Sequence, residues 1–146
     1  IKLKKNYFEC VLSLHTIYHI DKNLQAKAVR KLINISKKNA PIIIVYSNPN
    51  TLINRIKNKI SKKRLKKNKT NLYFFCHPVK WWSQFEKNTH VEIKPWRSFS
   101  SDHQKLIFPN NIIGKILLHF LFIFEEKFEK FFINNFQYYT VILKKK

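Results

Sequence analysis

Residues 8–21 read FECVLSLHTIYHID, an apolar run that changes within a few positions into a segment with two histidines and a tyrosine. The β-forming residues from Tyr7 to Leu14 predict a buried strand that ends at a polar turn. Such a stretch is either a core strand leading into a helix or a strand whose end carries polar groups to an active site. The elements that follow decide between the two.

A helix and a second strand come next. Asp21 or Asn23 caps a helix that extends to about Ser36. The following strand is PIIIVYS, residues 41–47, a continuous β-branched run typical of the middle of a parallel sheet. Strand, helix and strand in this order predict a βαβ crossover, with 8–14 and 41–47 as parallel neighbours in an α/β fold. The expected apolar face of the helix consists of Leu24, Ala28, Val29, Leu32 and Ile33.

The later part of the chain has weaker patterns. A second helix is predicted over residues 52–60, followed by a basic linker, KKRLKKNKTN, at 62–71. A short helix starts at His77-Pro78, a brief strand covers 91–93, and a polar insertion begins at 98. The last elements are a helix over 112–132 and a strand over 136–143. The expected buried stripe of that helix is Ile113, Leu117, Phe120, Leu121, Phe124, Phe128 and Phe131.

The charge of the chain is strongly positive, with 29 basic against 8 acidic residues and a net charge of +21. Nucleic acid is the first partner that such a balance suggests, and an anionic membrane surface is the second. The alternative explanation is compositional drift of the gene, because the lysines are spread along the chain among many asparagines and isoleucines. An apolar share of 45% excludes wholesale disorder and supplies the core of one domain.

Cysteines, glycine and hydropathy exclude several classes of protein. Cys10 and Cys76 are isolated, which predicts buried thiols in a reducing, cytoplasmic compartment and neither a disulfide framework nor a metal site. The longest apolar stretch, 116–124, is far shorter than the roughly 20 residues that span a bilayer, so no transmembrane segment is predicted. Gly114 is the one glycine, which excludes a glycine-rich phosphate loop within these residues.

The order of elements and the residues of 8–47 resemble the C-terminal half of Rossmann-like S-adenosylmethionine-dependent methyltransferases. Phe8-Glu9-Cys10-Val11 through Tyr18-His19-Ile20 is similar to the fourth strand of that family and its following loop. A helix with a Q-x-x-A centre, a lysine-rich turn and a hydrophobic strand then continue the similarity. The resemblance implies strands four to seven of the family's sheet, with 136–143 antiparallel beside 41–47. It also implies that residues 1–146 are the C-terminal portion of one methyltransferase domain, with an insertion at 98–132.

The sequence also departs from the family's pattern. Glu9 stands where the family has Asp, and Lys38-Asn39-Ala40-Pro41 replaces a Pro-Gly-Gly turn, although Asn39 can adopt the left-handed conformation that glycine supplies. The first strand with its glycine-rich loop, the acidic residue that grips the ribose and the third strand are not in this sequence. The resemblance therefore implies that the N-terminal, cofactor-binding half lies upstream of Ile1 and that these residues are inactive alone.

The end of the first strand carries the candidate catalytic and cofactor-binding residues. Open α/β sheets bind ligands at the carboxyl ends of their strands, and the resemblance puts Ser13, Leu14, His15 and Thr16 beside the methionine part of S-adenosylmethionine. His15 and His19 are the catalytic candidates, because a neutral imidazole can take a proton from an oxygen or nitrogen acceptor. The alternatives are that His15 only hydrogen-bonds its loop and that His19 only packs against the fold.

Tyr18, His77, Trp82 and Arg97 are the candidate substrate-binding residues. Aromatic walls can enclose a planar acceptor, and Arg97 can donate two hydrogen bonds to a carboxylate or phosphate. Ordinary core and surface packing is the alternative. The expected function is methyl transfer from S-adenosylmethionine to a small-molecule acceptor. The rival functions are a basic nucleic-acid-binding module, an RNA-directed methyltransferase, or a protein whose 112–132 helix rests on a membrane or partner surface.

Overall fold

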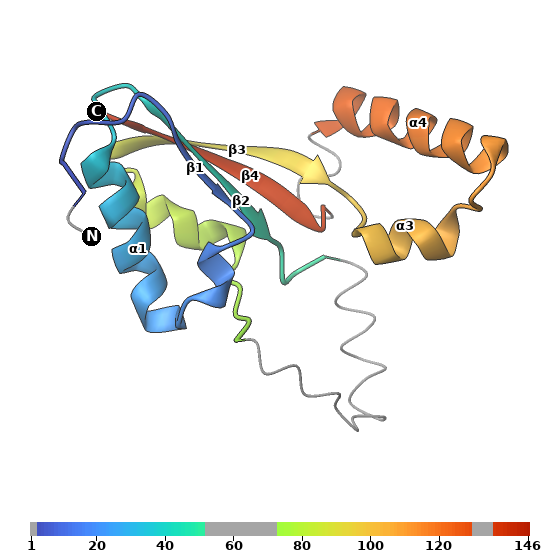
Figure 1. The fold of residues 1–146 in the computed structure, drawn as a ribbon, viewed down its shortest axis with the longest axis horizontal. Helices are drawn as coiled ribbons and strands as arrows, with labels where there is room; N and C mark the ends of the chain where they lie inside the picture. The colour runs from blue at the N-terminus through green and yellow to red at the C-terminus, as the bar shows by residue number, and fades with distance from the viewer. Residues whose placement is uncertain (1–2, 52–72, 130–135) are drawn as a thin grey trace.

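The computed structural model describes residues 3–51, 73–129 and 136–146. Figure 1 shows one sheet with helix α1 and the 3-10 helix η2 beneath it, and the helices α3 and α4 extending from one end. The helix predicted over 52–60 and the basic linker at 62–71 lie outside the described residues. In chain order the elements are β1 (Val11–Leu14), η1 (Ile17–His19), α1 (Lys22–Ile35), β2 (Pro41–Ser47), η2 (Val79–Phe85), β3 (Thr89–Arg97), α3 (Ser101–Ile107), α4 (Ile112–Lys127) and β4 (Tyr138–Lys145).

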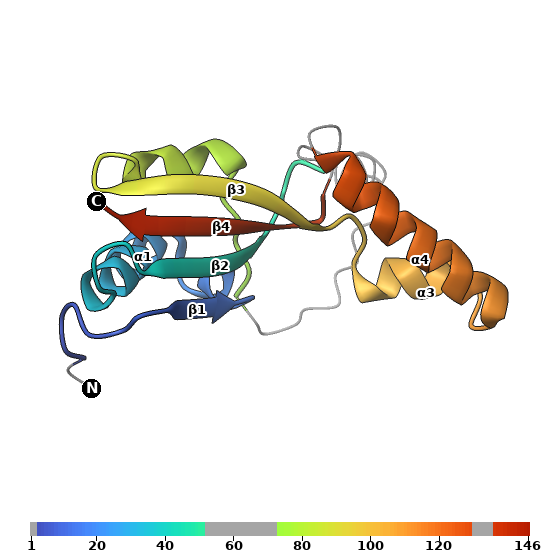
Figure 2. The ribbon, with the colours of Figure 1, turned by 90° about the horizontal axis from the view of Figure 1, so that it is seen from above.

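The four strands form one mixed sheet in the order β1-β2-β4-β3. β1 is parallel to β2, with Val11 opposite Ile42 and Leu14 opposite Val45, and α1 lies in the crossover between them. β4 lies between β2 and β3 and is antiparallel to both. Figure 2, seen from above, shows β1 and β3 as the two edges of the sheet. The α/β fold and the parallel pair predicted from the sequence are confirmed, as is the antiparallel last strand that the resemblance implied.

β1 is shorter than the sequence predicted. It begins at Val11 rather than near Tyr7, because the preceding residues pair with the end of α1 instead of with β2. The backbone N–H groups of Tyr7 and Phe8 both donate to the carbonyl of Ile35. Phe8 makes only an isolated bridge to Ser36.

β3 is longer than the predicted strand at 91–93. Its side chains alternate between the buried and the exposed side along the whole of Thr89–Arg97. Because β3 is an edge strand, its outer face can carry the exposed ion pair between Lys94 and Glu92, and it can accommodate Pro95. A prediction based on apolar runs therefore missed the ends of this strand, because they contain charged residues and a proline.

The hydrophobic core lies between the sheet and the helices α1, η1 and η2. The helix α1 begins where Asp21 caps it, with the carboxylate accepting from the N–H of Asn23 at 2.9 Å. Of its predicted apolar face, Val29 and Ile33 are buried, but Leu24 is 51% exposed. The buried core cluster consists of Val11, Ile17, Tyr18, Val29, Ile33, Ile42, Ile44, Tyr46, Trp82, Phe85, Tyr139, Val141 and Leu143.

α3 and α4 form an arm beyond the carboxyl ends of β1 and β2 (Figures 1 and 2). The predicted polar insertion contains α3, and the predicted 112–132 helix ends at Lys127. The predicted buried stripe is wrong for the described part of this helix, since Ile113 and Phe120 are both 63% exposed. Phe131 lies outside the described residues. The inward side of α4 instead buries Gly114 and Glu125. None of the helices within the described ranges is long and apolar enough to cross a membrane.

Candidate functional site

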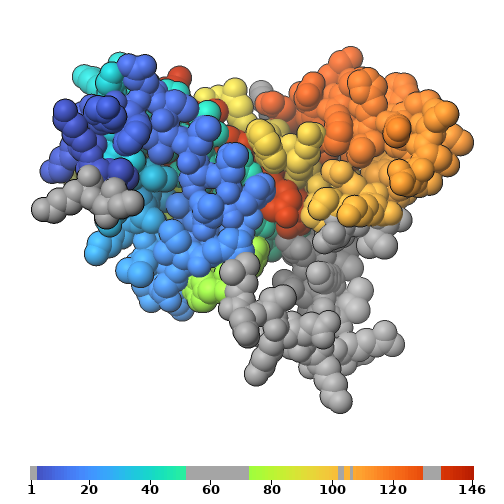
Figure 3. All heavy atoms as spheres, in the orientation of Figure 1, coloured from blue at the N-terminus to red at the C-terminus, as the bar shows by residue number. Residues whose placement is uncertain are grey.

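A cleft of about 360 Å³ opens at the end of the sheet where β1 and β2 terminate. Parallel strands end at one edge of a sheet, and open α/β sheets bind their ligands at that edge. In Figure 3 the blue residues of β1 and η1, the gold α3 and the red start of β4 meet around this opening. This strand-end cleft is lined by His15, Tyr18, Trp96, Arg97, Phe99, Ser101, Gln104 and Tyr138.

The backbone of His15 is in the left-handed region, with a φ of 56°. That conformation costs a residue other than glycine roughly 1–2 kcal/mol, and such strained residues cluster at functional sites. The N–H of His15 donates to the carbonyl of Val45 at 3.2 Å, which extends the ladder one residue past β1. The imidazole Nδ1 lies 3.0 Å from the Tyr18 hydroxyl, and the ring meets Tyr138 edge-on with centroids 4.8 Å apart. The imidazole is therefore held between two tyrosines at the cleft.

The protonation states of His15 and Tyr18 follow from their surroundings. Burial, and to a smaller extent the nearby His19, lowers the pKa of His15 below its ordinary value of 6.5, so the imidazole is neutral at pH 7. Burial, and then the neighbouring Tyr138 and Cys76, raises the pKa of Tyr18 to about 12, so its hydroxyl keeps its proton. When Nδ1–H of His15 donates to the Tyr18 oxygen, Nε2 carries a free lone pair that can accept a proton.

Arg97 lies where β3 leaves the sheet. A register shift between Pro95 and Arg97 interrupts the pairing with β4, and such bulges redirect side chains. The guanidinium carbon is 4.0 Å from the centroid of the Phe122 ring in α4, a cation–π contact. The next residue, Ser98, donates its N–H to the Glu125 carboxylate at 3.1 Å. These contacts with α4 fix Arg97 at the side of the cleft.

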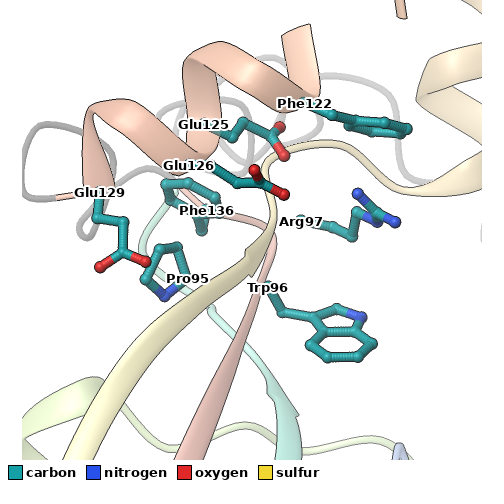
Figure 4. A pocket seen from close by; sticks show the side chains of 8 residues that line it. All are labelled: Pro95, Trp96, Arg97, Phe122, Glu125, Glu126, Glu129 and Phe136. Atoms are coloured by element: carbon teal, nitrogen blue, oxygen red, sulfur yellow. The ribbon is translucent and has the colours of Figure 1, made fainter. Parts of the chain in front are cut away.

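A second recess, of about 250 Å³, shares Trp96 and Arg97 with the strand-end cleft. Figure 4 shows the Arg97 guanidinium beside the Phe122 ring, with the carboxylates of Glu125 and Glu126 on the same helix. We call this the glutamate recess, because three of the eight acidic residues of the chain line it. Among the described residues, the lining of the strand-end cleft contains no carboxylate, which distinguishes it from the glutamate recess. The glutamate recess is lined by Pro95, Trp96, Arg97, Phe122, Glu125, Glu126, Glu129 and Phe136.

The predicted cofactor-binding residues divide between two faces of β1. Ser13 is buried on the α1 side, and its hydroxyl lies 2.6 Å from the Thr16 hydroxyl. Both line a mainly apolar groove of about 630 Å³ along β1 and α1. Leu14 is 53% exposed and points to the opposite face, because side chains alternate along a strand. Of these four residues, the strand-end cleft contains only His15.

The second catalytic candidate, His19, lies outside the strand-end cleft. Its Nδ1 is 2.9 Å from the carbonyl oxygen of Tyr73, and because a carbonyl only accepts, Nδ1 carries the proton. Its ring packs against the rings of Tyr18 and Phe74. In this structure His19 therefore ties η1 to residues 73–74.

The predicted substrate-binding residues also separate into two groups. Tyr18 and Arg97 meet in the strand-end cleft, although they are far apart in the sequence. Trp82 is completely buried, and its indole N–H donates to the Tyr139 hydroxyl at 2.9 Å. The ring of His77 stacks on Trp81 with centroids 4.4 Å apart. Because Trp82 has no exposed surface and His77 does not line the cleft, we leave both out of the candidate site.

Several cleft residues were not selected from the sequence. Phe99, Ser101 and Gln104 come from the segment that was interpreted only as a polar insertion. Tyr138 could have been found, because an antiparallel strand beside β2 has to begin at the edge where β2 ends. No sequence signal of that kind exists for the α3 residues.

Comparisons with known proteins give matches among solved structures only. No family model matches the sequence, and no curated protein does. An S-adenosylmethionine-dependent methyltransferase from Archaeoglobus fulgidus matches 98% of the chain with a TM-score of 0.56 and 20% identity. One from Thermotoga maritima, described as a possible histamine N-methyltransferase, matches 100% with a TM-score of 0.55 and 15% identity. The chain spans 62% and 60% of the lengths of these two proteins.

The strand order, the parallel crossover and the strand-end cleft define an open α/β protein of the Rossmann-like type. Within that type, the two matches show that the chain has the fold of S-adenosylmethionine-dependent methyltransferases. At these identities the likeness is one of fold. The resemblance in residues 8–47 had implied the same fold.

Proposed function

We propose that this protein takes part in methyl transfer from S-adenosylmethionine to a small-molecule acceptor, and that the strand-end cleft binds the acceptor. The observation that carries the proposal is the meeting of His15, Tyr18 and Arg97 in one cleft at the carboxyl ends of the parallel strands. The fold shared with two methyltransferases supports the choice of reaction. Because Cys10 and Cys76 are both free thiols, we propose that the protein works in the reducing cytoplasm.

We propose that the turn after β1 contacts the methionine end of S-adenosylmethionine. The exposed turn after β1 leaves Leu14 and His15 open to a ligand, in keeping with the methionine end that the resemblance assigns to them. Glu9 is exposed and paired with Lys37 at 2.7 Å, and the one glycine lies inside α4. A ribose-binding acid and a glycine-rich loop are thus not provided by the described ranges. We therefore propose that these 146 residues alone are inactive and that other residues hold the nucleoside.

When bound, S-adenosylmethionine supplies a sulfonium methyl group for an in-line displacement, and the protein contributes position and proton transfer. Nε2 of neutral His15 accepts the proton that the acceptor oxygen or nitrogen releases, while Nδ1–H stays bonded to Tyr18. Arg97 donates hydrogen bonds to an anionic group of the acceptor. Trp96, which is 50% exposed, packs against the planar part of the acceptor.

The test compares these 146 residues alone with the same residues joined to any sequence that their gene encodes before Ile1, which we call the complete gene product. Calorimetric titration with S-adenosylmethionine and transfer of a labelled methyl group to a panel of aromatic acids and amines should give binding and turnover for the complete product only. Arg97→Gln should raise KM for acids at least tenfold, whereas Arg30→Gln, an exposed change on α1, should not. A complete product that does not bind S-adenosylmethionine would remove the basis of the proposal.

A further inference from the structure

The end of the sheet opposite the strand-end cleft, where β1, β2 and β3 begin and β4 ends, carries a cluster of lysines. We define the lysine cluster as Lys4, Lys5, Lys37, Lys38, Lys87, Lys144, Lys145 and Lys146. The acidic residues in the same segments are Glu9, which pairs with Lys37, and Glu86. In Figure 3 the dark blue start of the chain, the cyan segment around residue 40 and the red end of β4 come to the surface together. The charge is therefore gathered from segments far apart in the sequence.

Backbone hydrogen bonds hold these segments together. The N–H of Asn39 donates to the carbonyl of Lys145 at 3.2 Å, and the N–H of Lys146 donates to that of Asn88 at 3.1 Å. The ammonium of Lys145 donates to the Asn6 side chain at 2.6 Å, which brings in the start of the chain. An ammonium has three donors, so a lysine with one neutral partner can still bind a phosphate. The cluster is thus organised before any ligand binds.

An exposed aromatic ring accompanies the lysines. Tyr7 is 56% exposed, and its ring lies within 5.6 Å of the Lys4 ammonium. Lysines that bind phosphates together with an aromatic ring that stacks on a base are the features of single-strand nucleic-acid binding. A membrane surface would use the charge but would not require a flat stacking surface.

We propose that the lysine cluster binds a single-stranded polynucleotide, with Tyr7 stacking on a base. The inference goes beyond the proposed methyl transfer and does not depend on it. The cluster and the strand-end cleft lie at opposite ends of the sheet, about 20 Å apart along the seven residues of β2. A polynucleotide bound here would therefore leave the strand-end cleft open.

The test uses a fluorescent 12-nucleotide oligouridylate and two triple variants of equal charge. The cluster triple removes three lysines of the lysine cluster by the changes Lys38→Gln, Lys87→Gln and Lys144→Gln. The α1 triple removes three exposed charges on α1 by the changes Lys27→Gln, Arg30→Gln and Lys31→Gln. Binding of the cluster triple should weaken at least tenfold, and its slope of log affinity against log salt should fall by about 2, at roughly 0.7 per phosphate contact. The α1 triple should change affinity less than threefold.

Tyr7→Ala separates the polynucleotide from other polyanions. It should weaken binding about fivefold or more without changing the salt slope, because stacking releases no counterions. If the two triple variants lost the same affinity for the oligonucleotide, only the net charge would matter, and that result would overturn the proposal. So would an unchanged affinity of Tyr7→Ala, or binding to phosphatidylserine vesicles without binding to the oligonucleotide. Melting curves of each variant check that it remains folded.

Discussion

Val11 and His15 belong to the same short stretch, yet their surroundings differ. Val11 is 7% exposed and packs in the core, so Val11→Ala should lower the free energy of unfolding by about 1–3 kcal/mol. In the complete gene product, turnover per folded molecule should stay close to that of the wild type. Leu12, on the other face of β1, is 61% exposed and provides the matched control. In urea unfolding, the free energy of unfolding of Leu12→Ala should differ from that of the wild type by less than about 0.5 kcal/mol.

His15 should behave in the opposite way. Asn is the better replacement than Ala, because Asn tolerates the left-handed backbone that His15 adopts. His15→Asn should leave the melting temperature nearly unchanged and lower methyl transfer by the complete gene product at least tenfold, about 1.4 kcal/mol. Single-turnover rates and thermal melts measure the two effects. An early melt with normal methyl transfer would make His15 a loop residue without a chemical role.

The lowered pKa of His15 also predicts a pH dependence of stability. Since the folded-state pKa lies below the unfolded value of about 6.5, the unfolded chain takes up its proton first as the pH falls. The contribution to stability is therefore complete above pH 6.5 and is lost progressively below it. Melting temperatures between pH 7.5 and 5 should decline less steeply for His15→Asn than for the wild type. An identical decline in both would contradict a depressed pKa.

At the scale of elements, Gln25 joins α1 to the sheet and to residues 73–77. It is completely buried, and its amide donates to the carbonyls of Ile20 at 3.0 Å and Phe75 at 2.9 Å. Its oxygen accepts from the Tyr46 hydroxyl at 2.6 Å, and that hydroxyl in turn accepts from the N–H of His77. Gln25, the first residue of the Q-x-x-A centre, thus supplies a buried polar link between α1 and the sheet.

Gln25→Ala should therefore destabilise the fold strongly. It leaves two carbonyls and a hydroxyl without this partner, and each unsatisfied buried group costs about 1–3 kcal/mol. We expect a loss of at least about 2 kcal/mol in urea unfolding, with the segment around Phe75 becoming sensitive to proteolysis first. Lys27→Ala, on the exposed side of the same helix, serves as the control and should change stability by less than about 0.5 kcal/mol. Equal effects of the two changes would contradict the role of this network.

The accuracy of the sequence prediction differs between elements for physical reasons. The bounds of β2 were predicted correctly, because a continuous β-branched run is typical of a strand in the middle of a sheet, where both faces are covered. α4 was misjudged because its apolar residues cover most of the helix, so periodicity does not identify the side that faces inward. The structure turns Glu125 inward, where its carboxylate accepts from the N–H of Ser98. A single hydrogen bond to a distant backbone cannot be read from the spacing of residues.

At the scale of the whole molecule, the candidate site is assembled from three distant segments. His15 and Tyr18 were identified because they follow a strand end, and Arg97 because of its chemistry. Their meeting depends on β4 entering between β2 and β3, which brings the end of β3 to the edge where β1 and β2 terminate. The strand order was predictable only through the resemblance to a known fold, whereas composition and periodicity leave it open.

The net charge of +21 predicts how the whole molecule responds to salt. The pairs Lys37–Glu9 and Lys94–Glu92 join exposed side chains, and such pairs contribute little, so repulsion among lysines outweighs attraction. Raising sodium chloride from about 10 to about 150 mM shortens the screening length from roughly 30 to 8 Å and should raise the melting temperature. The rise in melting temperature should shrink most when Lys38, Lys87 and Lys144 are changed to Gln, because these lysines belong to the lysine cluster. The α1 triple is the control of equal charge, and a melting temperature that falls with salt would mean that attractive pairs dominate.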